Sequence, residues 1–235
     1  MAGWLESGAG LTGPLRLIYP ELTLAFTLLV TVLHFRGLRR TRDELAAVRL
    51  YFVSFFGLVL AAPLLIAVLT GPGLRAALAG WGWTFGRAGL GLGLTAAGLP
   101  LAVLSGFIGS RDPEMQKMYP FAKGACAGVR TFVGYELSYV LFYYVPWESA
   151  FRGVLFLPLV PAIGLVPALA VQTAISTLLH IGHPEKEVFA AAGAGVVFGL
   201  IAWATGSFLY PLILHAATGV ATDTFLFLRR DRRRP

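Results

Sequence analysis

Ionisable residues within long apolar runs are the feature of this sequence that points most directly to chemistry. Glu148, Arg152, His180 and His215 each lie in or at the end of such a run. A charge at bilayer depth costs roughly 2.5–3.5 kcal/mol on insertion scales, and intramembrane ionisable residues usually face the interior of a helix bundle. A carboxylate can activate water, and a neutral imidazole can transfer a proton or hold an oxyanion. These residue types therefore predict acid–base chemistry inside a membrane.

The spacing of Glu148 and Arg152 places both on one face of a helix, where they can pair. The alternative is a buried ion pair that only sets helix register. Buried ion pairs are weak evidence for stability, so the functional interpretation is favoured. Glu136 precedes Glu148 in the same run and could line the same cavity or pair with a basic loop residue.

Asp223 and the residues after His180 are further candidates. Asp223 follows His215 by about 80° around a helix. It could orient a histidine, pair with Arg152, or be an ordinary interfacial residue. By contrast, the residues of the short loop after His180 are expected to be solvated: His183, Glu185 and Glu187.

A metal enzyme is a weaker hypothesis. Glu148, His180, His215 and Asp223 are acceptable zinc ligands by type. They are scattered over three apolar runs, however, and the sequence lacks His-Glu-x-x-His. We therefore expect no metal and no cofactor. The single cysteine, Cys126, excludes a disulfide within the chain.

The composition defines the elements that must position these residues. Of the 235 residues, 57% are hydrophobic and only 13% are charged, whereas a soluble domain carries about 25% charged residues. The sequence therefore predicts one all-α integral membrane domain, residues 1–235. A membrane-spanning helix needs about 20 apolar residues. Seven runs qualify: 15–35, 48–69, 89–108, 131–157, 159–179, 188–205 and 208–228.

Two segments between the apolar runs differ in character. Residues 71–87 form an interfacial loop or an eighth, re-entrant piece. Residues 110–130 form a polar cytoplasmic segment with a short helix that is broken at Pro120. Pro146 is expected to kink the fourth span just before Glu148.

Lysines and arginines predict the topology, because cytoplasmic loops are enriched in them. With the N-terminus outside, the inner side holds Arg36, Arg39, Arg40, Arg42, Arg49, Arg111, Lys117, Lys123, Arg130, Lys186 and the arginines of the C-terminal tail, and the outer side holds only Arg16, Arg75 and Arg87. We therefore expect a cytoplasmic C-terminus, a bacterial inner-membrane location and membrane lipids as partners. No aromatic residues interleave the basic clusters, so nucleic acid is not an expected partner. The start of the chain lacks a signal-peptide pattern, so no cleaved signal peptide is expected.

Three short motifs occur in order: Trp147-Glu148-Ser149-Ala150-Phe151-Arg152 followed by Gly153, Ser176-x-x-x-His180, and His215-x-x-x-Gly219. Over residues 131–228 this order resembles the CPBP family (CAAX protease and bacteriocin-processing, or ABI) of intramembrane proteases. The family motifs are Glu-Glu-x-x-x-Arg, Phe-x-x-x-His and His-x-x-x-Asn or Asp. This chain departs from them at Trp147, Ser176 and Gly219, and its His180-Ile181-Gly182-His183-Pro184 fits a His-x-Gly-x-Pro variant.

The resemblance implies a helical core with an intramembrane endopeptidase site. By that resemblance Glu148 would activate water, His180 would hold it or transfer a proton, and His215 would stabilise the oxyanion. Arg152, Asp223 and Glu136 would support them. The implied substrate is a membrane-associated or lipidated, CAAX-type protein. Trp147 favours the alternative, a non-catalytic relative that binds or shields a partner. No sequence feature indicates an oligomeric state.

Overall fold

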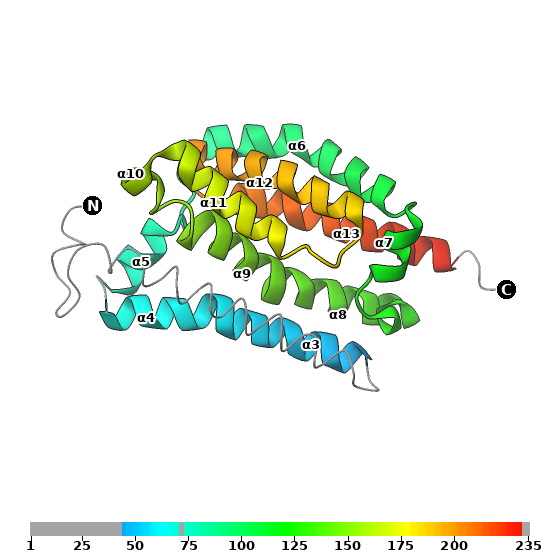
Figure 1. Cartoon of the computed structure of the whole chain (residues 1–235). Helices are drawn as coiled ribbons and strands as arrows, with labels where there is room; N and C mark the ends of the chain where they lie inside the picture. The colour runs from blue at the N-terminus through cyan, green and yellow to red at the C-terminus, as the bar shows by residue number, and fades with distance from the viewer. Residues whose placement is uncertain (1–43, 71–72, 232–235) are drawn as a thin grey trace.

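The structure is a computed structural model that describes residues 44–70 and 73–231, and this part of the chain is helical, with no β-strand (Figure 1). The predicted all-α class is therefore confirmed. The predicted span 15–35 lies outside the described residues. In chain order the α-helices are α3 (Glu44–Phe55), α4 (Ala62–Thr70), α5 (Leu74–Gly80), α6 (Ala88–Gly109), α7 (Pro113–Met118), α8 (Val129–Tyr139), α9 (Val145–Glu148), α10 (Val160–Ile163), α11 (Leu165–Leu178), α12 (Glu185–Thr205) and α13 (Leu209–Asp231).

Several of these helices are joined by π-helical turns rather than by loops. Phe56–Ala61 connects α3 to α4, Val140–Tyr144 connects α8 to α9, and Ser149–Val154 extends α9. The chain is therefore helical without interruption from Val129 to Val154. Pro146 lies at the start of α9, directly after one π-helical turn. Since proline lacks the N–H that would continue the hydrogen-bond ladder, the wider turn accommodates it without ending the helix.

Four helices of the described part are long and apolar enough to cross a membrane: Glu44–Leu69, Ala88–Gly109, Glu185–Thr205 and Leu209–Arg230. They correspond to four of the predicted runs. The helix over the predicted span 131–157 is not among the four, and it carries Glu136, Glu148 and Arg152. The predicted span 159–179 is divided at Gly164, which has a positive φ of 92°. This leaves α11 with 14 residues, short of the roughly 20 that cross a bilayer.

Small residues bring the long helices together. α6 packs along α13, and α11 packs along α12. A Cβ placed on Gly106 of α6 would lie only 2.7 Å from the Thr218 carbonyl oxygen of α13, and one on Gly195 of α12 would lie 2.9 Å from the side chain of Thr173. Glycine therefore permits the close backbone approach that is typical of helix packing in membranes.

Polar contacts gather at one end of the bundle, where α3 and α12 begin and α13 ends (Figure 1). The links there are Lys186 Nζ to Asp112 Oδ2 at 2.7 Å, Arg229 Nη1 to the Ser110 carbonyl at 2.7 Å, and the Lys123 backbone N–H to Glu44 Oε2 at 2.8 Å. These residues belong to segments that the arginine and lysine pattern assigns to one side of the membrane.

Candidate active site

Glu148 is the most buried charged residue of the site and joins two helices. It is the last residue of α9, with no exposed surface. Its Oε1 accepts a hydrogen bond from Arg152 Nη1 at 3.2 Å, and lies 2.6 Å from His215 Nδ1 on α13. The helical spacing of four residues explains the first contact. The second depends on the packing of α13 against α9, which contact one another.

Two further polar atoms of this group lack partners among the described residues. Glu148 Oε2 and Arg152 Nε are buried and have no hydrogen-bond partner there. The Arg152 guanidinium also lies 5.5 Å from the centre of the Phe198 ring on α12, within the range of a cation–π interaction. Buried polar groups in proteins are almost always hydrogen-bonded, and these two atoms are exceptions among the described residues.

The partner atoms define the protonation of both histidines. His180 Nδ1 lies 2.8 Å from the Ser176 carbonyl oxygen, which can only accept, so Nδ1 carries the proton and the neutral ring presents Nε2 as an acceptor. Burial lowers the pKa of His180 to about 4, so the ring is neutral at pH 7. His215 Nδ1 likewise donates to the Glu148 carboxylate. About a quarter of the His215 side chain, 23%, is exposed.

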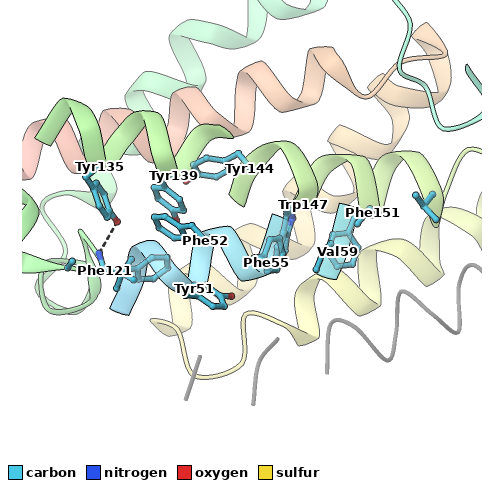
Figure 2. Close-up of a cluster of buried hydrophobic side chains, with 14 of the residues drawn as sticks. Tyr51, Phe52, Phe55, Val59, Phe121, Tyr135, Tyr139, Tyr144, Trp147 and Phe151 are labelled. Atoms are coloured by element: carbon cyan, nitrogen blue, oxygen red, sulfur yellow. Dashed lines mark hydrogen bonds between the residues drawn. The ribbon is translucent and has the colours of Figure 1, made fainter. Parts of the chain in front are cut away.

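Trp147 lies between the two histidines. Its indole meets the His180 ring at 5.3 Å and 81°, and the His215 ring at 6.4 Å and 73°. The indole is buried and continues an aromatic row that includes Phe55, Tyr139 and Phe52 (Figure 2). The position where the family motif has its first glutamate is therefore part of the aromatic core.

The other two departures from the motifs also have local explanations. A Cβ on Gly219 would overlap the Tyr144 hydroxyl, and the Tyr144 ring lies 4.7 Å from the His215 ring. The Tyr144 hydroxyl thus fills the space beside His215 that a side chain at position 219 would use. Ser176 holds His180 through its backbone carbonyl, while its own hydroxyl donates to the Thr173 carbonyl at 3.1 Å.

Glu136 and Asp223 lie together in another part of the bundle. Both carboxyls are buried and interact with each other, one from α8 and one from α13. Along the helix, Glu136 is roughly 18 Å from Glu148 at 1.5 Å per residue. The structure thus pairs the two predicted supporting carboxylates with each other, and it pairs Arg152 with Glu148 rather than with Asp223.

Sequence reasoning did not single out Tyr144, Phe198, Tyr119 or Glu187 as site residues. Tyr144 precedes Glu148 by one helical turn, which is a usable signal. Glu187 follows His183 by four residues, a spacing at which two helical side chains can pair, so it too left a usable signal. Phe198 and Tyr119 reach the histidines from segments distant in sequence, and no spacing rule predicts that. Within residues 44–70 and 73–231, no group of three or more His, Cys, Asp or Glu side chains is placed to hold a metal ion.

Comparison with known proteins gives one match. Residues 131–221 match the family model described as type II CAAX prenyl endopeptidase Rce1-like. No curated protein and no solved structure matches the chain. The matched segment contains Glu148, Arg152, His180 and His215. The resemblance to the CPBP family that the motifs indicated is therefore confirmed over residues 131–221, which are similar to the Rce1-like CAAX prenyl endopeptidases.

Proposed function

We propose that this protein is an intramembrane endopeptidase that hydrolyses peptide bonds of membrane-associated or lipidated, CAAX-type substrates. The family match supports a CAAX-type protease at the level of the family. The observation that carries the proposal for this chain is the 2.6 Å contact between Glu148 Oε1 and His215 Nδ1, buried between two helices and separated from His180 by the Trp147 indole.

His215 is the proposed oxyanion-binding residue. With Nδ1–H held by the Glu148 carboxylate, the imidazolium form of the ring presents a second N–H at Nε2. An N–H aimed at the oxygen of a tetrahedral intermediate is a strong source of catalysis in a site of low dielectric. Because Glu148 Oε1 already accepts from His215 and Arg152, we assign to Glu148 the holding and orienting of His215. This role replaces the direct activation of water expected from the motif.

His180 is the proposed water-activating residue. Its Nε2 accepts a hydrogen bond from the attacking water while Nδ1 stays bonded to the Ser176 carbonyl. Proton transfer from water to Nε2 accompanies attack on the peptide carbonyl. The protonated His180 then returns that proton to the leaving nitrogen as the carbon–nitrogen bond breaks, so the ring ends the cycle neutral.

The test is cleavage of a panel of membrane peptides, with and without a prenylated C-terminal cysteine, by the purified protein in lipid nanodiscs. Products are identified by mass spectrometry. We expect His180→Asn to lower kcat/KM by at least 100-fold, a typical contribution of acid–base catalysis. We expect Glu148→Gln to lower it by about 10- to 100-fold, the usual effect of removing a partner that orients a functional histidine. Glu114→Gln, at an exposed position, is the control and keeps the parent rate. Equal cleavage by parent, Glu148→Gln and His180→Asn would show that these roles are wrong.

A non-catalytic function is the second candidate, and Trp147 is the observation that favours it. The indole is buried and stacked where the motif has a carboxylate. A protein of this kind would bind or shield a membrane partner. It predicts no peptide product from the parent protein in the same panel, and unchanged recovery of a bound partner after His180→Asn.

A further inference from the structure

A second carboxylate–imidazole pair lies on the His180 side of Trp147. His183 Nδ1 is 3.0 Å from Glu187 Oε1 and 3.1 Å from the Tyr119 hydroxyl oxygen. The Tyr119 hydroxyl donates to the same Glu187 oxygen at 2.5 Å. The His183 ring stands 5.4 Å from the His180 ring, at 62°. Successive ring contacts therefore cross the site, from His183 to His180, Trp147 and His215.

The protons of this network can be assigned from its partners. Tyr119 has one hydroxyl hydrogen, and the 2.5 Å contact uses it toward Glu187. A carboxylate only accepts, so His183 must carry its own hydrogen on Nδ1 to bond with Glu187. The arrangement repeats that of Glu148 and His215: a carboxylate holds Nδ1–H, and Nε2 is left for other contacts.

The network is also held rigidly in place. Tyr119 is buried, and the side chains of His183 and Glu187 are only 20% and 17% exposed. Phe121 meets the His183 ring edge-on at 6.0 Å. One residue before Glu187, Lys186 joins Asp112 at 2.7 Å and ties the first turn of α12 to the segment before α7. The Oε2 atom of Glu187 is buried and has no partner among the described residues.

A buried neutral imidazole such as His180 is a weak base unless nearby negative charge stabilises its protonated form. In this family the first motif carboxylate occupies position 147, and here that position holds an indole. Glu148 is engaged on the far side of the indole with His215 and Arg152. Glu187 of α12 lies on the other side of the indole, the side of His180. It contacts His183, and the His183 ring in turn contacts the His180 ring.

We propose that Glu187, acting through His183, is the carboxylate that supports His180 during water activation, in place of the carboxylate absent at Trp147. This inference rests on the proposed endopeptidase function. Glu187 is a positioning residue: it holds His183 and places negative charge beside His180, and it neither takes nor gives a proton. The proton moves from water to His180 Nε2 and then to the leaving nitrogen, so the hydrolysis is balanced without it.

The experiment compares Glu187→Gln with Glu185→Gln. The control changes an exposed carboxylate two residues earlier on the same helix, α12. We expect Glu187→Gln to lower kcat by about 10- to 100-fold, the usual effect of removing a partner that orients a functional histidine, with KM nearly unchanged. Glu185→Gln should keep both parameters. Tyr119→Phe removes one donor to Glu187 and should lower kcat by a smaller factor. A kcat for Glu187→Gln equal to that of the parent, in folded protein, would overturn the proposal.

A spectroscopic readout separates this proposal from the proposed function. The chain has four histidines, so ¹⁵N imidazole signals of the protein in nanodiscs can be assigned by substituting each in turn. We expect His183 to be protonated on Nδ1 in the parent and in Glu185→Gln, and to lose that preference in Glu187→Gln. If the parent cleaves no peptide, the proposed function fails, while the ¹⁵N signals still report whether Glu187 holds His183. If Glu187→Gln does not fold, Tyr119→Phe and His183→Gln must lower kcat, or the proposal fails.

Discussion

Glu148 carries two contacts on one carboxylate oxygen and none from the described residues on the other. Each unsatisfied buried polar atom costs about 1–3 kcal/mol. Replacing a buried ion pair by apolar residues is often neutral or stabilising. The pairing of Glu148 is therefore better explained by a role toward His215 than by a role in folding.

The buried imidazole of His180 gives the protein an acid sensitivity of predictable sign. Its pKa is about 4 in the folded protein and about 6.5 in an unfolded chain. Between these values the unfolded state binds the proton and the folded state does not. Stability therefore falls as the pH drops from about 6.5 to about 4, by up to roughly 1.4 kcal/mol per pH unit.

His180→Asn isolates this contribution, because asparagine does not titrate in that range. The free energy of unfolding of both proteins would be measured by denaturant titration in detergent from pH 7 to pH 4. We expect the parent to lose more stability than the variant over this interval. Parallel curves for the two proteins would contradict the assignment of a neutral, buried His180.

Gly219 and Tyr144 form a steric pair that substitution can test. A Cβ at position 219 would lie 2.7 Å from Tyr144 Cζ. Overpacking of a well-packed core usually costs about 1–3 kcal/mol, so Gly219→Ala should destabilise by that amount. The double variant Tyr144→Ala with Gly219→Ala should be more stable than the sum of the two single effects predicts, as measured by denaturant unfolding. Strict additivity would show that the two residues do not compete for the same space.

At the scale of the elements, the two π-helical turns around α9 determine how Glu148 is presented. They flank Val145–Glu148 on both sides, and π-helical turns within α-helices are frequent at functional sites. The second turn places Arg152 and Gly153 against other parts of the bundle: a Cβ on Gly153 would lie 2.6 Å from the Trp81 carbonyl oxygen. The glycine after Phe151-Arg152 is therefore required by the close approach of the residues that follow α5.

The packing of α6 on α13 predicts contrasting effects for two glycines of one helix. A Cβ on Gly106 would meet backbone atoms of Thr218 and Thr222 at 2.7 and 2.8 Å, whereas one on Gly93 would meet nothing within 4 Å. Backbone atoms cannot move away from an added Cβ as easily as the end of a flexible side chain can. We expect Gly106→Ala to destabilise by about 1–3 kcal/mol and Gly93→Ala to be neutral or slightly stabilising, since alanine favours the helix. Thermal unfolding in detergent measures both, and equal melting temperatures would contradict the packing.

Sequence reasoning was strongest where a feature depends on residues close together in the chain. The Glu148–Arg152 contact follows from helical spacing, and the runs 89–108 and 208–228 follow from apolar length. It was weaker where one residue overrides a pattern: Gly164 divides an apolar run of sufficient length. Contacts between segments that are distant in the sequence were not predicted. His183 and Glu187 have the composition of a solvated loop, but Glu187 lies in the first turn of α12, and the Tyr119 hydroxyl contacts both residues.

At the scale of the whole molecule, the segments that the basic residues assign to one side of the membrane meet at the polar end of the bundle. Lys117 of α7 lies at this end, and Arg75 of α5 lies at the opposite end (Figure 1). Lysine and arginine favour the cytoplasmic side, so the polar end is expected to face the cytoplasm.

Labelling of introduced cysteines tests this orientation in cells and in inverted membrane vesicles. Cys126→Ala removes the native thiol, and Lys117→Cys or Arg75→Cys adds one at an exposed position. Because a membrane-impermeant maleimide reaches only one side, Lys117→Cys should react in inverted vesicles and not in intact cells. Arg75→Cys should show the opposite pattern, which makes each variant the control for the other. The reverse result for both would place the polar end, and with it the Tyr119–His183–Glu187 network, on the outer face, where a cytoplasmic substrate could not reach it.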